Sequence, residues 1–223
     1  MRAVALIPAY NESRTIEQVI AGIRQQVDHV LVVDDGSTDA TAQLALTAGA
    51  EVIRRTENGG KGLAVRDGLA RVLEDSFTHV LMLDADLQHK PEEAALLLAT
   101  AVRTDADLVI GERQFRRESM PPNRYWANRI GSRALSAFVG VPINDTQCGF
   151  RVCRIDALRS MHLRSRGYDI ETEMLIKLRR RGASVVSVPI TAVYAGGRSK
   201  LRPVRDTTKT CFLAVYYRYL ERL

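Results

Sequence analysis

Cysteine is scarce in this chain, and long apolar runs are absent. Only three cysteines occur in 223 residues, a small and odd number that does not suit a fold built on disulfides. No stretch approaches the ~18 uninterrupted apolar residues of a membrane-spanning helix. The first apolar run ends at Pro8, too early for the core of a signal peptide. We therefore expect a cytoplasmic protein, with contact at a membrane surface left open.

Two common nucleotide-binding motifs are also missing. No Gly-x-Gly-x-x-Gly follows the first apolar run, which argues against a dinucleotide-binding oxidoreductase. The same position lacks the glycine-rich Arg/Lys loop of a nucleotidyltransferase. Residues 58–62 are rich in glycine and contain Lys61, but their spacing is not that of a P-loop. We expect this segment to form a tight turn.

Basic residues are sparse in the first half of the chain and abundant in the second. Residues 1–111 carry 10 basic and 17 acidic residues, a balance of −7, whereas residues 112–223 carry 22 and 9, a balance of +13. Overall, 46% hydrophobic and 26% charged residues are typical of a folded globular chain. The uneven charge favours an anionic partner: nucleic acid, a membrane surface or a phosphorylated substrate.

Strands and helices alternate in the predicted pattern, with no internal repeat or linker, so we expect a single domain, residues 1–223. Short apolar runs predict buried strands at residues 4–8, 30–33, 50–53, 80–83 and 108–110. Longer segments predict helices at residues 15–27, 40–48, 62–73, 91–103, 125–139 and 170–181, another strand at 185–188, and a final amphipathic helix at 207–220. Ser37 and Asp39 are candidate N-caps for the second helix, and Pro91 suits a first turn. This alternation predicts a parallel, three-layer α/β sheet, in which ligands bind beyond the carboxyl ends of the strands.

Two adjacent carboxylates, Asp34 and Asp35, follow the second predicted strand. Their mutual repulsion is unfavourable unless something binds them. Ribose hydroxyls, a base N–H or a metal ion would each serve. The alternative is a helix-capping turn, since Asp, Gly and Ser are also turn residues. The residues alone leave both interpretations open.

A second acidic pair, Asp84 and Asp86, follows the fourth predicted strand. Where the strand breaks into a loop, both carboxylates can turn toward one ion. Carboxylate oxygens suit Mg²⁺ or Mn²⁺, which is usually shared with substrate phosphates. Gln88 can add a neutral oxygen and His89 an imidazole. Together with the first acidic pair, this motif predicts a metal-assisted site.

These motifs, in their order along the chain, resemble those of family 2 glycosyltransferases with a GT-A fold, in particular the dolichyl-phosphate mannose synthase group of polyprenyl-phosphate glycosyltransferases. The stretches that carry the resemblance are residues 8–12, 33–37, 58–62, 84–89, 111–113, 145–151 and 199–200. The resemblance implies a three-layer α/β/α sandwich with a mostly parallel central sheet. It also implies an inverting, metal-dependent transfer of a hexose from a nucleoside-diphosphate sugar, GDP-mannose or a UDP-sugar, to a polyprenyl or dolichyl phosphate.

The resemblance also implies roles for individual residues. The base and ribose would be held by Pro8, Tyr10, Glu12, Val33 and Asp35, and the divalent ion by Asp84, Asp86 and Gln88. Phosphates of the donor or acceptor would meet Arg113 and Lys200. Further candidate binding residues are Asp34, Lys61, Ala85, Arg129 and Arg198. Residues 1–111 would then form a nucleotide- and metal-binding half, and residues 112–223 an acceptor half.

The acceptor decides whether a base is needed. A phosphate oxygen is already anionic at neutral pH and requires only charge compensation, for which arginines are suited; the candidates are Arg113, Arg129, Arg133 and Arg198. A sugar hydroxyl on a soluble acceptor, the alternative, would require a carboxylate base. Asp145 is then the first candidate, followed by Asp169 and Glu171.

The final predicted helix mixes aromatic and basic residues, and we expect no transmembrane tail. It suits peripheral contact with a membrane, packing on the core, or packing on a second subunit in a homo-oligomer. A non-enzymatic nucleic-acid-binding protein would explain the positive charge but not the acidic strand ends. Nucleic acid is therefore not an expected partner.

Overall fold

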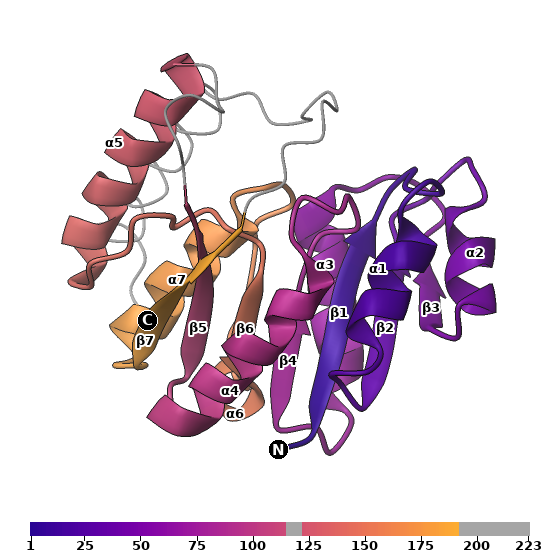
Figure 1. Cartoon of the computed structure of the whole chain (residues 1–223), viewed down its shortest axis with the longest axis horizontal. Coiled ribbons are helices and arrows are strands. Elements are labelled where there is room, and N and C mark those ends of the chain that lie inside the picture. The colour runs from indigo at the N-terminus through magenta and orange to yellow at the C-terminus, as the bar shows by residue number, and fades with distance from the viewer. Residues whose placement is uncertain (115–121, 192–223) are drawn as a thin grey trace.

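The computed structural model of the chain describes residues 1–114 and 122–191, and a seven-stranded sheet runs through this part of the chain (Figure 1). The strand order is β3-β2-β1-β4-β6-β5-β7. The strands are β1 (Ala3–Ala9), β2 (His29–Asp34), β3 (Glu51–Arg54), β4 (His79–Met82), β5 (Leu108–Arg113), β6 (Arg151–Arg154) and β7 (Val185–Ile190). The final helix predicted at 207–220, together with Arg198 and Lys200, lies outside the described residues.

The helices form layers on both faces of the sheet. They are α1 (Ile16–Ile23), α2 (Thr41–Thr47), α3 (Lys61–Leu73), the 3₁₀ turn η1 (Pro91–Glu93), α4 (Ala94–Thr104), α5 (Pro122–Val139), α6 (Ile155–Leu158) and α7 (Ile170–Arg180). In Figure 1, α1 and α4 lie in front of the sheet, while α3 and α7 lie behind it and contact each other. This arrangement confirms the predicted three-layer fold. Within the described ranges, no helix is both long enough and apolar enough to cross a bilayer.

The sheet is mixed, because β6 runs antiparallel to both of its neighbours, β4 and β5. The prediction of a mostly parallel sheet is confirmed, but β6 itself was not predicted. Its four residues, Arg-Val-Cys-Arg, contain no apolar run, and Arg151 is nonetheless fully buried. A strand that begins and ends with a charged residue cannot be predicted from apolar periodicity.

Helix boundaries differ from the predicted ones by a few residues at several ends. The first helix ends at Ile23 rather than residue 27, because the chain turns back toward β2 and Gln26 donates its side-chain amide to the carbonyls of Gly22 and Pro91. Pro91 begins a 3₁₀ turn before α4. The second helix has Ala40 at its N-cap position, but Asp39 Oδ1 still accepts the Thr41 N–H at 3.0 Å.

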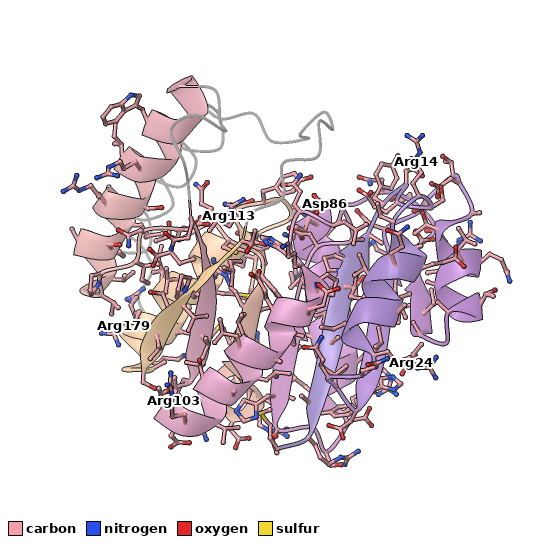
Figure 2. The ribbon with its side chains drawn as sticks, viewed as in Figure 1. Arg14, Arg24, Asp86, Arg103, Arg113 and Arg179 are labelled. Atoms are coloured by element: carbon pink, nitrogen blue, oxygen red, sulfur yellow. The ribbon has the colours of Figure 1, made fainter. Side chains whose placement is uncertain are left out.

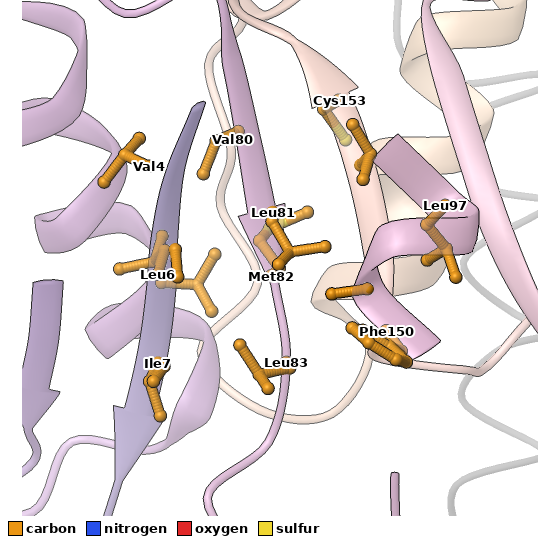
Figure 3. Close-up of a cluster of buried hydrophobic side chains, with 14 of the residues drawn as sticks. Val4, Leu6, Ile7, Val80, Leu81, Met82, Leu83, Leu97, Phe150 and Cys153 are labelled. Atoms are coloured by element: carbon orange, nitrogen blue, oxygen red, sulfur yellow. The ribbon is translucent and has the colours of Figure 1, made fainter. Parts of the chain in front are cut away.

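The core is made where strands and helices interdigitate around β1 and β4 (Figure 3). Leu6, Leu81 and Phe150 are fully buried there. Gly68 on α3 lets the helix approach the sheet closely. An added Cβ at this position would overlap Leu6 Cδ1 and lie 2.9 Å from Val33 Cγ2.

Gly68→Ala should therefore destabilise the protein. Overpacking costs about 1–3 kcal/mol, and alanine returns up to about 1 kcal/mol in helix propensity, so we expect a net loss of about 1–2 kcal/mol. Urea unfolding followed by circular dichroism measures this change. Ala70→Val adds bulk at an exposed position of the same helix and should change stability by less than about 0.5 kcal/mol. Equal effects of the two substitutions would contradict a close approach at Gly68.

Candidate active site

The carboxyl ends of three parallel strands lie together at one edge of the sheet, because β1 lies between β2 and β4 and is parallel to both. The segments after β1 and β2 are tied together: Asn11 donates its N–H to Ser37 Oγ and accepts the Thr38 N–H on its side chain, each at 2.9 Å. Glu12 donates its N–H to Thr41 Oγ1 at 2.8 Å. Of the predicted site residues, those placed at this edge are Pro8, Tyr10, Glu12, Val33, Asp34, Asp35, Lys61, Asp84, Ala85, Asp86 and Gln88.

The two carboxylates after β2 have different surroundings. Asp34 is fully buried, accepts the Ser37 N–H at 3.1 Å and lies 3.4 Å from Arg54 Nε. The first contact is that of a turn, and the second is an ion pair with β3. Asp35 accepts the N–H groups of Gly59 and Gly60 at 2.9 and 2.8 Å and pairs with Arg55 Nε at 2.9 Å. Asp35 thus fixes the glycine-rich segment against the end of β2.

Glycine is required at residue 60 because its φ is +97° and an added Cβ would overlap the carbonyl oxygen of Arg166. The Gly62 N–H donates to the same carbonyl at 2.9 Å. The glycine-rich segment therefore packs between Asp35 on one side and the backbone of residues 165–167 on the other. This packing delivers Lys61, the first residue of α3, to the end of β4.

At the end of β4, Lys61 lies between two carboxylates. Its Nζ is 2.5 Å from Asp84 Oδ1 and 2.6 Å from Glu171 Oε1, and its side chain is 13% exposed. Burial would lower the pKa of Lys61, but the charges of Asp84 and Glu171 raise it above the ordinary value. Burial likewise would raise the pKa of Asp84, but the Lys61 charge lowers it. Asp84 is therefore held as a carboxylate.

Asp86 and Gln88 occupy the loop that follows. Asp86 Oδ1 accepts the Gln88 N–H at 3.1 Å, across Leu87, which has a φ of +57°. Burial and the neighbouring charge of Asp84 raise the pKa of Asp86 to about 6. A cation placed here would relieve the repulsion between the two carboxylates.

The oxygen donors of this loop fit a hard divalent cation. Asp84 and Asp86 supply carboxylate oxygens and Gln88 an amide oxygen, the ligands that Mg²⁺ and Mn²⁺ accept. Among the described residues, no three His, Cys, Asp or Glu side chains cluster in a way that would hold a metal ion.

Arg113 at the end of β5 lies at the same edge of the sheet as Asp86 (Figure 2). It makes a two-point ion pair with Asp145, with Nε–Oδ2 at 2.6 Å and a second contact to Oδ1 at 3.0 Å. Asp145 is 1% exposed. Both oxygens of the first candidate base are thus engaged by a guanidinium. Arg129 and Arg133 lie exposed on α5, which contacts α7.

Arg151 fixes the backbone next to the site through buried hydrogen bonds. No role was predicted for it from the sequence. Its fully buried guanidinium donates to the carbonyl oxygens of Cys148, Thr146 and Glu171 at 2.6, 2.6 and 2.8 Å. These bonds fix the loop that carries Asp145 to the first turn of α7. Gly149 in this loop lies so close to the loop after β4 that an added Cβ would be 2.9 Å from Asp84 Oδ2.

His89 is buried against the ring of Phe150, with centroids 5.4 Å apart. Its Nδ1 has no hydrogen-bond partner among residues 1–114 and 122–191. Burial, together with the charge of Arg113, lowers the pKa of His89 to about 4. The neutral ring therefore packs the loop after β4 against Phe150.

This shift predicts a pH-dependent stability. Below about pH 6.5 the unfolded chain protonates His89 while the folded chain does not, so the free energy of unfolding falls as the pH falls from about 6.5 to 4. We expect a loss of roughly 2–3 kcal/mol across this range. Urea titrations at several pH values measure it, and His89→Leu should reduce the slope. His162→Gln, at an exposed ring, should leave the slope unchanged; equal slopes in wild type and His89→Leu would contradict the assignment.

Comparisons with known proteins agree with the predicted family. Residues 4–161 match the family described as Glycosyl transferase family 2. The undecaprenyl-phosphate mannosyltransferase of Micrococcus luteus is 37% identical over 215 residues, covering 90% of this chain and 88% of that protein. The polyprenol monophosphomannose synthase of Mycolicibacterium smegmatis is 32% identical, covering 85% of this chain and 77% of that one.

A solved structure shares the fold. Glucosyl-3-phosphoglycerate synthase from Mycobacterium tuberculosis, in complex with Mn²⁺, UDP and glucosyl-3-phosphoglycerate, superposes with a TM-score of 0.74 at 24% identity, covering 97% of this chain and 79% of that one. The predicted GT-A fold is confirmed by this likeness. With acidic side chains at the strand ends and a family match over most of its length, the chain belongs to glycosyltransferase family 2 and is a hexosyltransferase.

Proposed function

We propose that the protein is an inverting glycosyltransferase that moves a hexose from a nucleoside-diphosphate sugar to a polyprenyl phosphate. The observation that carries the proposal is the meeting of the acidic loop, Asp84 to Gln88, with the guanidinium of Arg113 at one edge of the sheet. Such a site suits a reaction in which phosphates flank the reacting carbon. The named activities of the relatives from Micrococcus luteus and Mycolicibacterium smegmatis support the polyprenyl phosphate acceptor.

The nucleoside would bind at the ends of β1 and β2. A carboxylate offers about four acceptor positions, and Asp35 uses two of them on the N–H groups of Gly59 and Gly60, with Arg55 as an ion-pair partner beside it. The remaining positions would take a ribose hydroxyl. The remaining donor-binding candidates are Pro8, Tyr10, Glu12 and Val33.

The divalent ion would be held by Asp84, Asp86 and Gln88. When bound, it would offset negative charge on the departing nucleoside diphosphate. Lys61 keeps Asp84 ionised and Arg151 fixes the neighbouring loop. Arg151 thus keeps this neighbouring loop oriented before the donor arrives.

The transfer itself balances without a protein base. A phosphate oxygen of the acceptor attacks the anomeric carbon as the bond from that carbon to the donor's diphosphate oxygen breaks, and the electron pair leaves with the nucleoside diphosphate. The anomeric configuration inverts in this single displacement. Arg113, Arg129, Arg133, Arg198 and Lys200 are the candidates that compensate the acceptor charge. Asp145 is engaged by Arg113, and Glu171 by Lys61, which leaves these two candidate bases occupied.

The two halves of the chain would then bind different substrates. Residues 1–111 would bind the nucleotide and metal, and residues 112–223 would face the acceptor, within one domain. A lipid acceptor places the reaction at the cytoplasmic face of a membrane, with the segment at 207–220 as the candidate contact.

Product analysis tests this proposal. The protein is incubated with GDP-mannose or UDP-hexoses, Mn²⁺ or Mg²⁺, and a short polyprenyl phosphate in detergent. The expected product is a lipid-linked sugar that resists mild alkali and is released by mild acid. Transfer only to a sugar hydroxyl, giving a glycoside stable to mild acid, would overturn the phosphate acceptor.

A further inference from the structure

The Lys61 ammonium occupies the position beside Asp84 where positive charge is needed when no metal is bound. It contacts Asp84 Oδ1 at 2.5 Å and Glu171 Oε1 at 2.6 Å, and it lies 5.8 Å from the centre of the Tyr168 ring. Lys61, Asp84 and Glu171 come from the start of α3, the end of β4 and the first turn of α7. The ammonium is therefore a fixed internal cation at the metal loop.

A carboxylate that pairs with an ammonium shares its charge with that ammonium. Asp84 belongs to the predicted metal set, so Lys61 and the divalent ion draw on the same negative charge. We propose that Lys61 is a built-in competitor that weakens divalent-ion binding at Asp84, and that Glu171 limits this competition by holding Lys61. The inference rests on the proposed metal site and assigns positioning roles to Lys61 and Glu171.

The place of Glu171 explains why two carboxylates surround one lysine. Glu171 is 6% exposed and lies on a different element from Asp84. It gives the ammonium a second partner, so Lys61 keeps an ion pair with Glu171 when Asp84 binds the metal ion. Without Glu171, Lys61 would pair with Asp84 alone and would compete more strongly with the metal ion. The pair therefore sets an intermediate affinity, which lets the ion leave with the product.

A purely structural role makes a different prediction. If the three side chains only join α3, β4 and α7, then removing any of them loosens the metal loop and weakens binding. Competition instead predicts opposite signs: Lys61→Met should strengthen the binding of Mn²⁺, and Glu171→Gln should weaken it. The sign of each change separates the two roles.

The experiment is a titration of the full chain with Mn²⁺ alone, followed by electron paramagnetic resonance. We expect Lys61→Met to bind Mn²⁺ about tenfold more tightly, which corresponds to about 1.4 kcal/mol. We expect Glu171→Gln to bind it several-fold more weakly, and Lys61→Arg, which keeps the charge, to stay near wild type. Lys177→Met is the matched control, because Lys177 pairs with buried Glu173 at 2.8 Å on the same helix as Glu171. It should leave the affinity unchanged.

The outcomes are distinguishable. Weaker or unchanged binding in Lys61→Met overturns the competition. If Lys61→Met does not fold, as judged by circular dichroism, Lys61→Met in the Glu171→Gln background removes the unpaired buried carboxylate. That double variant must bind Mn²⁺ more tightly than Glu171→Gln alone, and equal or weaker binding overturns the inference. Absence of Mn²⁺ binding in wild type and every variant would instead overturn the metal site of the proposed function.

Discussion

Asp84→Asn should lower the rate of sugar transfer by about two to three orders of magnitude. The substitution keeps the shape of the side chain but removes the charge that would face the divalent ion of the proposed site. Loss of one preorganised electrostatic contact to a developing charge typically costs this much. The variant also leaves Lys61 with Glu171 as its remaining carboxylate partner among its observed ion pairs, so the local field becomes more positive and repels the ion. Steady-state transfer at saturating donor and metal measures the effect.

Asp75→Asn is the matched control for this substitution. Asp75 also pairs with a basic side chain, Arg71 Nη1 at 2.8 Å, but it lies after the far end of α3. It should retain nearly full activity. Wild-type activity in Asp84→Asn would contradict the role given to the acidic loop, whereas equal losses in both variants would point to general destabilisation.

Arg151→Met should destabilise the fold by at least about 3 kcal/mol. The substitution removes donors from three buried carbonyls, and each unsatisfied group costs about 1–3 kcal/mol. Because these carbonyls belong to the loop that carries Asp145 and to the first turn of α7, activity should fall as well. Urea unfolding and transfer assays on the same preparation measure the two effects. Arg151→Lys, which keeps one donor group, should recover part of the stability.

Arg154→Met is the control at the other end of β6. Arg154 pairs with Asp105 and Asp107 near the surface, where ion pairs contribute at most about 1 kcal/mol. We expect a correspondingly small loss of stability and little change in activity. A loss in Arg154→Met as large as that in Arg151→Met would contradict the role of the buried guanidinium.

The acidic ends of β2 and β4 were predictable because each follows an apolar run, and the order of strands brings such ends together. The glycine-rich segment was predicted to form a tight turn, but in the structure residues 58–60 are irregular and α3 already begins at Lys61. Its partner was not predicted: Gly60 packs on the Arg166 carbonyl, more than a hundred residues away. Contacts between residues so far apart in the sequence depend on how α3 and α7 pack against each other behind the sheet, which the sequence pattern does not predict.

Charged residues were the hardest to place. Lys61 was predicted as a substrate-binding residue, and the structure shows instead that its resident partners are Asp84 and Glu171. Whether it also meets substrate stays a prediction. Arg151 ends the stretch 145–151 that carries the family resemblance, but no role was predicted for it. Its burial depends on three carbonyls that the folded loop and the first turn of α7 supply. The burial of a charged residue that bonds to backbone carbonyls produces no apolar periodicity in the sequence, so it cannot be predicted from that pattern.

The central claim is that the acidic strand ends bind a nucleoside diphosphate through a divalent ion. The most direct measurement is a thermal-unfolding panel of nucleoside diphosphates, each with and without Mn²⁺ or Mg²⁺. Ligands that bind only the folded state raise the melting temperature. We expect a rise with GDP or UDP that requires the metal and disappears in both Asp84→Asn and Asp86→Asn. No rise with any nucleotide, or an equal rise in the variants, would contradict the account.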